Sequence, residues 1–179
     1  MRILLLGQHG QLSQELQLSL QGQYELIVRG RSRLDLADSE QIRQQVRELR
    51  PELIINAAAH TAVDQAESEP GAAFALNARA PGVLAEEAAS LGVPLIHYST
   101  DYVFDGSGTD PLGPDDATAP ANAYGRSKLE GELRVMTANP RSLIFRTAWV
   151  YSPFGKNFVK TMLALAEYFD HRHNQSRKA

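Results

Sequence analysis

An apolar run, a glycine-rich turn and an amphipathic helix follow one another at the start of the chain. Residues 3–6 are all apolar, as expected for a strand buried on both faces of a parallel sheet. The turn at residues 7–10 has glycine at each end, and Leu12, Leu16 and Leu20 are then spaced along one face of a helix. Backbone N–H groups at such a helix start can meet a pyrophosphate if no Cβ blocks the approach. This order therefore favours an α/β fold with a dinucleotide-binding turn.

Strand and helix patterns continue to alternate along the rest of the chain. Further strands are predicted at residues 24–28, 53–55, 94–98 and 143–145, and the main helices between them at 38–49, 70–91 and 121–136. We expect a Rossmann-type, doubly wound parallel sheet with right-handed crossovers. The predicted strand order is 3-2-1-4-5, and a sixth strand is left open.

Local signals define several helix features. Asp38 is placed as an N-cap, with Gln41 three residues later to complete a capping box. Pro81 should kink the 70–91 helix or divide it near Ala80, and this helix should pack on the sheet. In the 121–136 helix, Leu129 and Leu133 are predicted to face inward. A loop rich in Gly, Pro, Asp and Thr is expected over residues 106–122, where it can cover a site.

Composition excludes several classes of function. At 179 residues with 43% hydrophobic content, the chain suits one soluble domain. The net charge of −3 with interspersed signs argues against nucleic acid or an anionic membrane as a partner. No apolar run approaches 18 residues and no leader is evident, so a cytoplasmic protein is expected. The absence of cysteine excludes disulfides, thiolate nucleophiles and Cys-based zinc sites.

Tyr124 and Lys128 carry the strongest chemical signal. Four residues apart on a helix, their side chains share one face, and an ammonium beside a phenol lowers the pKa of the phenol toward the working range. An ordinary exposed pair is the alternative. At the end of the strand at 94–98, Thr100 can donate to a substrate carbonyl oxygen, and Asp101 can orient sugar or cofactor groups. Trp149, the only tryptophan, either stacks on a sugar or base or belongs to the core.

Two other segments suit a dinucleotide. Arg29, Arg31 and Arg33 follow the second strand, where arginine can accept a 2′-phosphate, so NADPH is favoured over NADH. A solvated basic loop is the alternative. The small side chains at residues 57–59 leave room for a cofactor across the sheet, although tight loop packing would also explain them. For His60, a structural hydrogen bond is as reasonable as a cofactor contact.

Together these motifs resemble a known family. Tyr-x-x-x-Lys at 124–128, Ser-Thr-Asp-Tyr-Val-Phe-Asp-Gly at 99–106 and the N-terminal glycine turn are similar to the extended short-chain dehydrogenase/reductases. The blocks at 56–64 and 146–151 extend the resemblance, which runs over residues 1–166. One position departs from the Gly-x-x-Gly-x-x-Gly turn of that family, because Ser13 replaces its third glycine. A slightly wider helix–sheet contact and weaker cofactor binding are expected there.

The resemblance implies an activity and a set of site residues. It implies NADPH-dependent reduction of the C4 keto group of dTDP-4-dehydro-L-rhamnose to dTDP-L-rhamnose, with Tyr124 as proton donor, Lys128 tuning Tyr124 and holding the nicotinamide ribose, and Thr100 on the substrate oxygen. Substrate contacts fall on Thr100, Asp101 and Trp149. The cofactor set comprises Gly7, Gly10, Gln11, Leu12, Arg29, Asp35, Leu36, Ala59, His60, Thr61, Tyr98, Tyr124 and Lys128.

Other interpretations stay open at this point. The chain could hold NADP(H) without catalysis, or act as a sugar-nucleotide epimerase or dehydratase of the same superfamily. Relatives imply a homodimer through the 70–91 helix, and Mg²⁺ with Glu15, although one carboxylate does not make a magnesium site. Residues 1–166 are expected to form the NAD(P)-binding domain and 167–179 a divergent, disordered polar tail. The resemblance also leads us to expect that the C-terminal substrate lobe of the family is missing, as in a truncated copy or a fragment.

Overall fold

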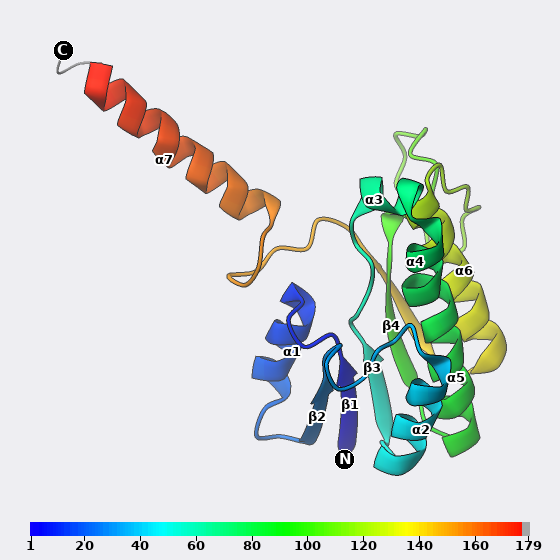
Figure 1. The fold of residues 1–179 in the computed structure, drawn as a ribbon. Helices are drawn as coiled ribbons and strands as arrows, with labels where there is room; N and C mark the ends of the chain where they lie inside the picture. Colours follow the sequence, from blue (N-terminus) through cyan, green and yellow to red (C-terminus); the bar gives the residue numbers. More distant parts are fainter. Residues whose placement is uncertain (177–179) are drawn as a thin grey trace.

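A five-stranded parallel sheet forms the centre of the molecule. The computed structural model describes the fold of residues 1–176 and the side chains of residues 1–168. The strands are β1 (Arg2–Leu6), β2 (Glu25–Arg29), β3 (Leu53–Asn56), β4 (Leu95–Thr100) and β5 (Leu143–Thr147) (Figure 1). All four pairings are parallel, and the spatial order is β2-β1-β3-β4-β5. The Rossmann-type α/β class predicted from the sequence is confirmed.

Helices connect the strands. In chain order they are α1 (Gln11–Leu20), α2 (Ser39–Leu49), α3 (Val63–Ser68), α4 (Pro70–Phe74), the π-helical turn η1 (Ala75–Arg79), α5 (Ala80–Leu91), the 3₁₀ turn η2 (Asp101–Val103), α6 (Ala123–Ala138) and α7 (Phe158–Ser176). Among the described residues, no helix has the length and apolarity needed to cross a membrane.

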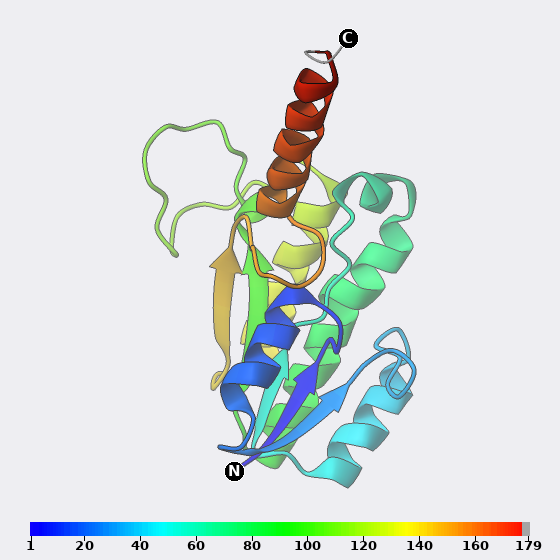
Figure 2. The same ribbon diagram turned by 90° about the vertical axis from the view of Figure 1, so that its left-hand side faces the viewer.

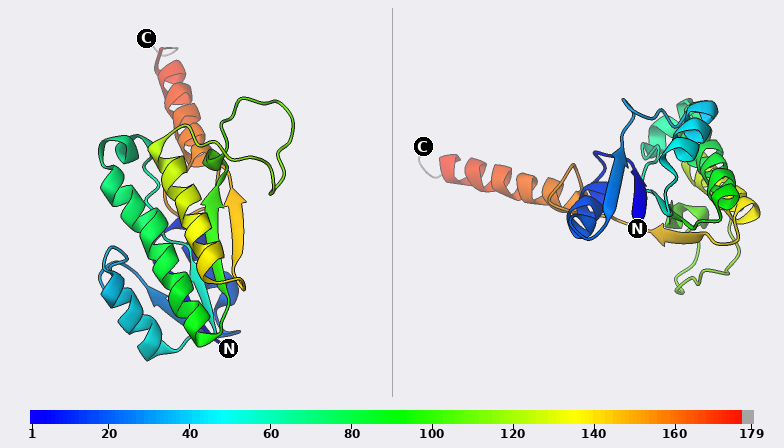
Figure 3. Two further views of the ribbon diagram at one scale, coloured as in Figure 1. Left: turned by 90° about the vertical axis from the view of Figure 1, so that its right-hand side faces the viewer. Right: turned by 90° about the horizontal axis from the view of Figure 1, so that it is seen from below.

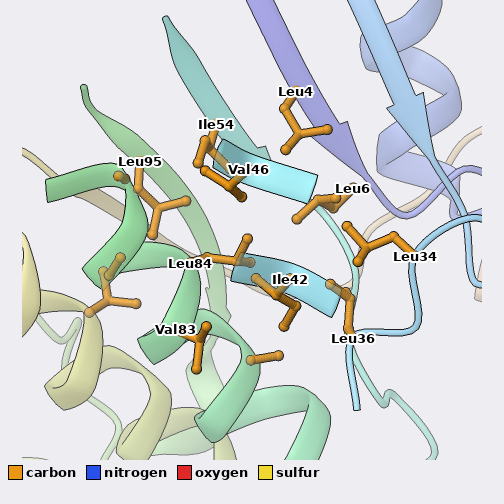
Figure 4. Close-up of a cluster of buried hydrophobic side chains, with 14 residues drawn as sticks. Leu4, Leu6, Leu34, Leu36, Ile42, Val46, Ile54, Val83, Leu84 and Leu95 are labelled. Carbon is orange, nitrogen blue, oxygen red and sulfur yellow. The ribbon is translucent and has the colours of Figure 1, made fainter. Parts of the chain in front are cut away.

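The two faces of β1 pack against different helices. Leu4 and Leu6 point into the larger core, which contains Ile42 and Val46 of α2 and Leu84 of α5 (Figure 4). Their neighbours Ile3 and Leu5 point the other way, into a smaller cluster that includes Leu16 and Leu20 of α1. Because side chains alternate along a strand, a run with no polar residue requires helices on both faces. Figure 3 shows α1 on one side of the sheet and α2, α5 and α6 on the other.

The predicted strand order, 3-2-1-4-5, is wrong. The third strand pairs with β1, not with β2, in the register Ile3↔Leu53. The reason is the face that each crossover helix covers. With α1 on one face and α2 on the other, two right-handed crossovers advance in opposite directions, so the chain returns past β1 before it forms β3. The direction of winding therefore reverses beside β1, at the carboxyl ends of β1 and β3.

The local helix predictions are partly confirmed. Asp38 caps α2 by accepting from the N–H groups of Glu40 and Gln41. The capping box is not completed, because the Gln41 side chain accepts from Asp35 N–H instead. The 70–91 helix divides at Ala80 as expected, through a π-helical turn in front of Pro81.

The prediction that Leu133 faces inward is wrong. More than half of Leu133 is exposed, whereas the buried face of α6 carries Gly125, Gly131 and several polar groups. The cause is close helix packing: a Cβ on Gly131 would lie 2.0 Å from the carbonyl oxygen of Asn77. Small residues on this face let α6 approach η1, which leucines at the same positions would prevent.

Two segments extend from the body. The irregular loop between η2 and α6 projects beside the β5 edge, and α7 runs away from the sheet (Figure 2). Helix α7 continues past residue 166, where the sequence places the end of the domain. The disorder expected for residues 167–179 stays a prediction, and residues 177–179 lie outside the described part of the chain.

A buried carboxylate ties α2 to α5. Glu87 is almost fully buried, and its carboxylate accepts from Arg47 at 2.7 Å and from Arg43 at 3.2 Å. The Arg47 hydrogen bond is the main cause of a lowered pKa of Glu87, and Arg43 acts in the same direction against desolvation. The neighbouring Glu86 also pairs with Arg43, but its side chain is half exposed.

Replacing Glu87 by Gln should destabilise the protein by about 1–2 kcal/mol at neutral pH, since Arg47 loses its charged partner and Arg43 loses one of its partners, while solvent screens the more exposed Arg47. A lowered folded-state pKa means that this stability is present above the ordinary value of 4.5 and is lost as the pH falls through the folded pKa. Urea unfolding at pH 7 and at acidic pH measures both effects. Glu86→Gln is the matched control, with a loss below about 0.5 kcal/mol. Equal losses for the two variants would contradict the buried role of Glu87.

Candidate active site

A trough runs across the carboxyl ends of the strands, where the winding of the sheet reverses. Its first pocket, of about 690 Å³, is lined by the glycine turn and by the loops after β2 and β3. A second pocket, of about 380 Å³, adjoins it and reaches Tyr98, Tyr124 and Lys128. The two pockets share the lining residues His9, Gly10, Ala57, Ala59 and Thr61. Open α/β sheets bind ligands at this place.

The glycine turn approaches the β3 loop too closely for a side chain. Gly7 has φ of +102°, and a Cβ there would lie 2.9 Å from the carbonyl oxygen of Ala57. Gly10 precedes α1, and no side chain caps that helix. The first N–H groups of α1 are thus open toward the trough, which suits a pyrophosphate. Ser13, in place of the third glycine, is fully buried against the sheet.

The first pocket contains most of the predicted cofactor residues on the β2 side. Arg29, Arg31, Asp35 and Leu36 line it, whereas Arg33 does not. Arg29 is held by Gln45 at 3.3 Å, and Arg31 is largely exposed, with its guanidinium 3.9 Å from the Asp35 carboxylate. The three arginines therefore differ in position: Arg29 and Arg31 line the first pocket, and Arg33 lies outside it.

The loop after β3 is held from beneath by a residue that the sequence analysis missed. Asn77 is fully buried; its side chain accepts from His60 N–H at 2.8 Å, and it donates to His60 C=O and to Ser127 Oγ at 3.0 Å. The π-helical turn aims this amide at the loop, a feature often found at functional sites. His60 thus has the structural hydrogen bonds considered from the sequence, made through its backbone, and it also lines the first pocket. An asparagine in an Ala-rich helix gave no distinct signal.

Tyr124 and Thr100 are brought together as predicted. Burial is the main cause of a raised pKa of Tyr124, and the nearby Asp101 charge adds to it, while a hydrogen bond with Thr100 acts in the opposite direction. Thr100 itself is buried and accepts from Tyr102 N–H at 3.2 Å. The ring of Tyr102 meets that of Tyr124 edge to face at 5.6 Å. The phenol therefore stays protonated at neutral pH.

Lys128 lines the second pocket together with Tyr124, but the hydrogen-bonding contacts of its amine are with other residues. Its Nζ donates to Tyr98 C=O at 2.6 Å and lies 3.5 Å from His97 Nε2. Burial lowers the pKa of Lys128 to about 8. The expectation that Lys128 lowers the pKa of Tyr124 is wrong for the protein by itself, because desolvation raises the pKa of the phenol.

The predicted substrate residues Asp101 and Trp149 are both exposed. The Asp101 carboxylate accepts from Thr100 Oγ1 at 3.1 Å. Trp149 is 77% exposed and meets Phe158 edge to face at 5.3 Å, so the alternative of a core tryptophan is wrong. Neither residue lines the two trough pockets.

Arg146 is a second residue that the sequence analysis left unassigned. It forms a two-pronged ion pair with the buried Glu132, lies over the Phe104 ring at 5.0 Å and donates to Pro114 C=O at 3.0 Å. These contacts join β5, α6 and the 104–122 loop. Its place in the Arg-Thr-Ala-Trp block was the available signal.

No magnesium site is supported. Among the described residues, no group of three or more His, Asp or Glu side chains is arranged to hold a metal ion. Glu15 lines a separate hollow with Tyr151, Asn157 and Lys160. A single carboxylate beside a lysine is a poor environment for Mg²⁺, which requires six oxygen ligands.

Replacing Gly7 by Ala should cost about 2–4 kcal/mol of stability and weaken dinucleotide binding, because the new Cβ meets the Ala57 backbone. Gly22→Ala is the matched control: Gly22 also has positive φ, of +79°, but a Cβ added there would meet nothing within 4 Å, so only about 1 kcal/mol of backbone strain is expected. Thermal unfolding and NADPH titration compare the two variants. Equal losses of stability and of NADPH binding in the two variants would show that the close approach of Gly7 to the Ala57 backbone contributes nothing.

Comparison with known proteins agrees with this geometry. The family model described as "RmlD substrate binding domain" matches residues 1–173. The chain is 49% identical to the dTDP-4-dehydrorhamnose reductase of Sinorhizobium fredii over 170 residues and 48% identical to that of Salmonella typhimurium over 171 residues. These alignments cover 95% and 93% of this chain, but the chain spans only 57% of each relative.

Solved structures give the same result. A dTDP-4-dehydrorhamnose reductase from Clostridium acetobutylicum superposes with a TM-score of 0.91 at 43% identity, covering 94% of this chain and 60% of that protein. The Bacillus anthracis enzyme, solved in complex with NADP, has a TM-score of 0.90 at 38% identity, covering 93% and 60%. Because the family model matches residues 1–173 of the 179 residues of this chain, the chain belongs to the RmlD substrate-binding-domain family.

Proposed function

We propose that this chain binds NADPH in the trough and reduces the C4 keto group of dTDP-4-dehydro-L-rhamnose, giving dTDP-L-rhamnose. One observation carries the proposal: Tyr124, Thr100 and Lys128 converge beside a pocket that adjoins the glycine turn. A proton donor, a hydroxyl and an amine at the end of a dinucleotide trough are the groups that carbonyl reduction requires. Relatives named dTDP-4-dehydrorhamnose reductase support the choice of substrate.

The residues present fit a dinucleotide. The uncapped start of α1 and the Gly7 turn would hold the pyrophosphate, while Arg29 and Arg31 would meet a 2′-phosphate and Asp35 with Leu36 the adenosine. Gln11, Leu12, Ala59, Thr61, Tyr98 and Lys128 line the second pocket, where the nicotinamide end would lie. When bound, the cofactor supplies the hydride. The NADP complex of the Bacillus anthracis relative supports NADPH, with NADH as the alternative.

Tyr124 is suited to donate a proton. Because burial raises the pKa of its phenol, the group is protonated at neutral pH and can pass its proton to a carbonyl oxygen as negative charge develops there. Thr100, hydrogen-bonded to the phenol, would turn its single O–H from Asp101 to the same oxygen and hold that oxygen in place. Lys128 would hold the nicotinamide ribose.

Exposed side chains outside the two trough pockets would bind the substrate. Asp101 and the exposed Trp149 would contact the sugar nucleotide, and the 104–122 loop, anchored by Arg146, would border it. The chain spans 57% of the length of the first relatives. An NADP(H)-binding protein with weak or no turnover is the second candidate. The exposure of Trp149 favours this second candidate, because little of the chain covers a side chain proposed to contact the sugar nucleotide. We further propose a cytoplasmic location and a homodimer through the α4–α5 helix.

Replacing Tyr124 by Phe should reduce turnover about 10²–10⁴-fold, because the proton donor is lost. NADPH binding should change little. The assay follows the absorbance of NADPH with dTDP-4-dehydro-L-rhamnose, and calorimetry measures the binding. Tyr24→Phe, at a partly exposed tyrosine before β2, is the matched control and should keep full turnover. Unchanged turnover in Tyr124→Phe would refute the assignment. NADPH binding without consumption by the native chain would favour the second candidate, and net consumption would exclude an epimerase.

Cofactor preference can be tested with the two exposed arginines of the β2 loop. Arg31→Ala should weaken NADPH binding roughly tenfold and leave NADH binding unchanged, because only NADPH carries the phosphate. Arg33→Ala removes the same charge outside the pocket and should affect neither cofactor. A parallel loss of NADPH and NADH binding in Arg31→Ala would argue against 2′-phosphate recognition.

A further inference from the structure

A row of buried polar side chains lies beneath the second pocket. Asn56 at the end of β3, His97 on β4 and Lys128 on α6 are each 0–1% exposed. Asn56 and His97 are cross-strand neighbours, with Asn56 Nδ2 3.2 Å from His97 Nδ1. His97 Nε2 in turn lies 3.5 Å from Lys128 Nζ. The reduction described above gives no role to Asn56 or His97.

The hydrogen bonds determine which ring nitrogen of His97 carries a proton. Ala58 N–H donates to Asn56 Oδ1 at 3.2 Å, so the nitrogen of that amide faces His97. An amide nitrogen only donates; His97 Nδ1 must therefore accept. Burial, and next the charge of Lys128, hold the pKa of His97 well below its usual range, so the ring is neutral. A neutral imidazole with an accepting Nδ1 has its proton on Nε2.

This proton points at Lys128. An ammonium at Nζ would place a second donor against the Nε2–H, whereas a neutral amine offers a lone pair that accepts it. The other Nζ contact, with Tyr98 C=O, can be made by either form. Burial already lowers the pKa of Lys128 to about 8, against a smaller opposite effect of Glu132, which is itself paired with Arg146.

Other ionisable groups near α6 are either bound elsewhere or line the same pocket. Glu67 of α3 accepts from Ala123 N–H, Asp101 of η2 accepts from Thr100, Glu87 of α5 binds two arginines, and Arg79 of η1 lines a hollow between α5 and α6. The second pocket also contains the ionisable side chains His9, Tyr98, Tyr124 and Lys156. Among these described groups, the His97 ring is the one that lies within hydrogen-bonding distance of Lys128 Nζ.

We propose that Asn56 and His97 are positioning residues for Lys128: Asn56 fixes the Nε2–H form of His97, this N–H favours the neutral amine, and dinucleotide binding is accompanied by proton uptake at Lys128. The proton comes from solvent and converts the amine to an ammonium. The negative charge and hydroxyl oxygens that a dinucleotide brings to the trough favour the ammonium form. Only the proton uptake rests on the proposed function.

Nuclear magnetic resonance of the protein without added cofactor tests the first half. The chain has four lysines, so ¹³C-labelled lysine gives few signals, and Lys128→Met assigns the relevant one. The native Lys128 signal should titrate near 8, not near 10.5. The ¹⁵N shifts of His97 should show a proton on Nε2 alone.

Asn56→Asp is the decisive variant, because a carboxylate accepts where the amide donated. The proton of His97 should move to Nδ1, the lone pair of Nε2 should face Lys128, and the Lys128 midpoint should rise by about one unit. Asn139→Asp is the matched control, at a buried asparagine that bonds Val93 C=O at the far end of the sheet, and should leave Lys128 unchanged. A native His97 protonated on Nδ1, or a Lys128 midpoint that is equal in the native protein and Asn56→Asp, would overturn the proposal.

Calorimetry with NADP⁺ in two buffers of different ionisation enthalpy tests the second half. About one pH unit above the native Lys128 midpoint, the native protein should take up close to one proton per bound cofactor, and Asn56→Asp markedly less. Binding without proton uptake by the native protein would overturn the coupling. Failure of NADP⁺ to bind would contradict the proposed cofactor site and, with it, the uptake, whereas the resonance experiment still decides the roles of Asn56 and His97.

Discussion

The alternation of side chains along β1 is the constraint on which the rest of the structure depends. Leu4 and Leu6 bury against α2 and α5, while Ile3 and Leu5 bury against α1. Helices on opposite faces make successive right-handed crossovers run in opposite directions, so the winding of the sheet reverses beside β1. At that reversal the Gly7 turn and the Ala57 loop are so close that no side chain fits between them. The trough is lined by both segments. The position of the site is thus a consequence of how one strand is packed.

Buried polar side chains with specific hydrogen-bond partners support the site. Asn77 holds the β3 loop to α6, and Arg146 with Glu132 holds the 104–122 loop to the sheet. Lys128 is among the largest fully buried side chains. Burying such groups is costly without partners, so their contacts constrain the backbone around the trough closely. The same desolvation raises the pKa of Tyr124 and lowers that of Lys128, which relates packing directly to chemistry.

Much of the fold was predictable because its signals are local. The apolar run of β1, the cap at Asp38 and the division of the long helix before Pro81 depend on neighbours in sequence, and each was found at or near its predicted place. The strand order was not predictable from these patterns, since it depends on which face each helix covers. The outward position of Leu133 was missed for a related reason: the inward face of α6 is chosen by close contact with η1, which amphipathic spacing does not reveal.

The sequence by itself determined the α/β class, the glycine turn and the residue types that can bind a dinucleotide or move a proton, because strand, turn and helix preferences act over a few residues. Tertiary structure alone decided which arginines reach the trough, that Trp149 is exposed, and that Lys128 faces His97 and Tyr98 C=O. The physical reason is that burial and hydrogen-bond partners come from strands and helices far apart in the chain. The residue type determines which chemistry a side chain can perform, and the surrounding residues determine its protonation state and its hydrogen-bond partners.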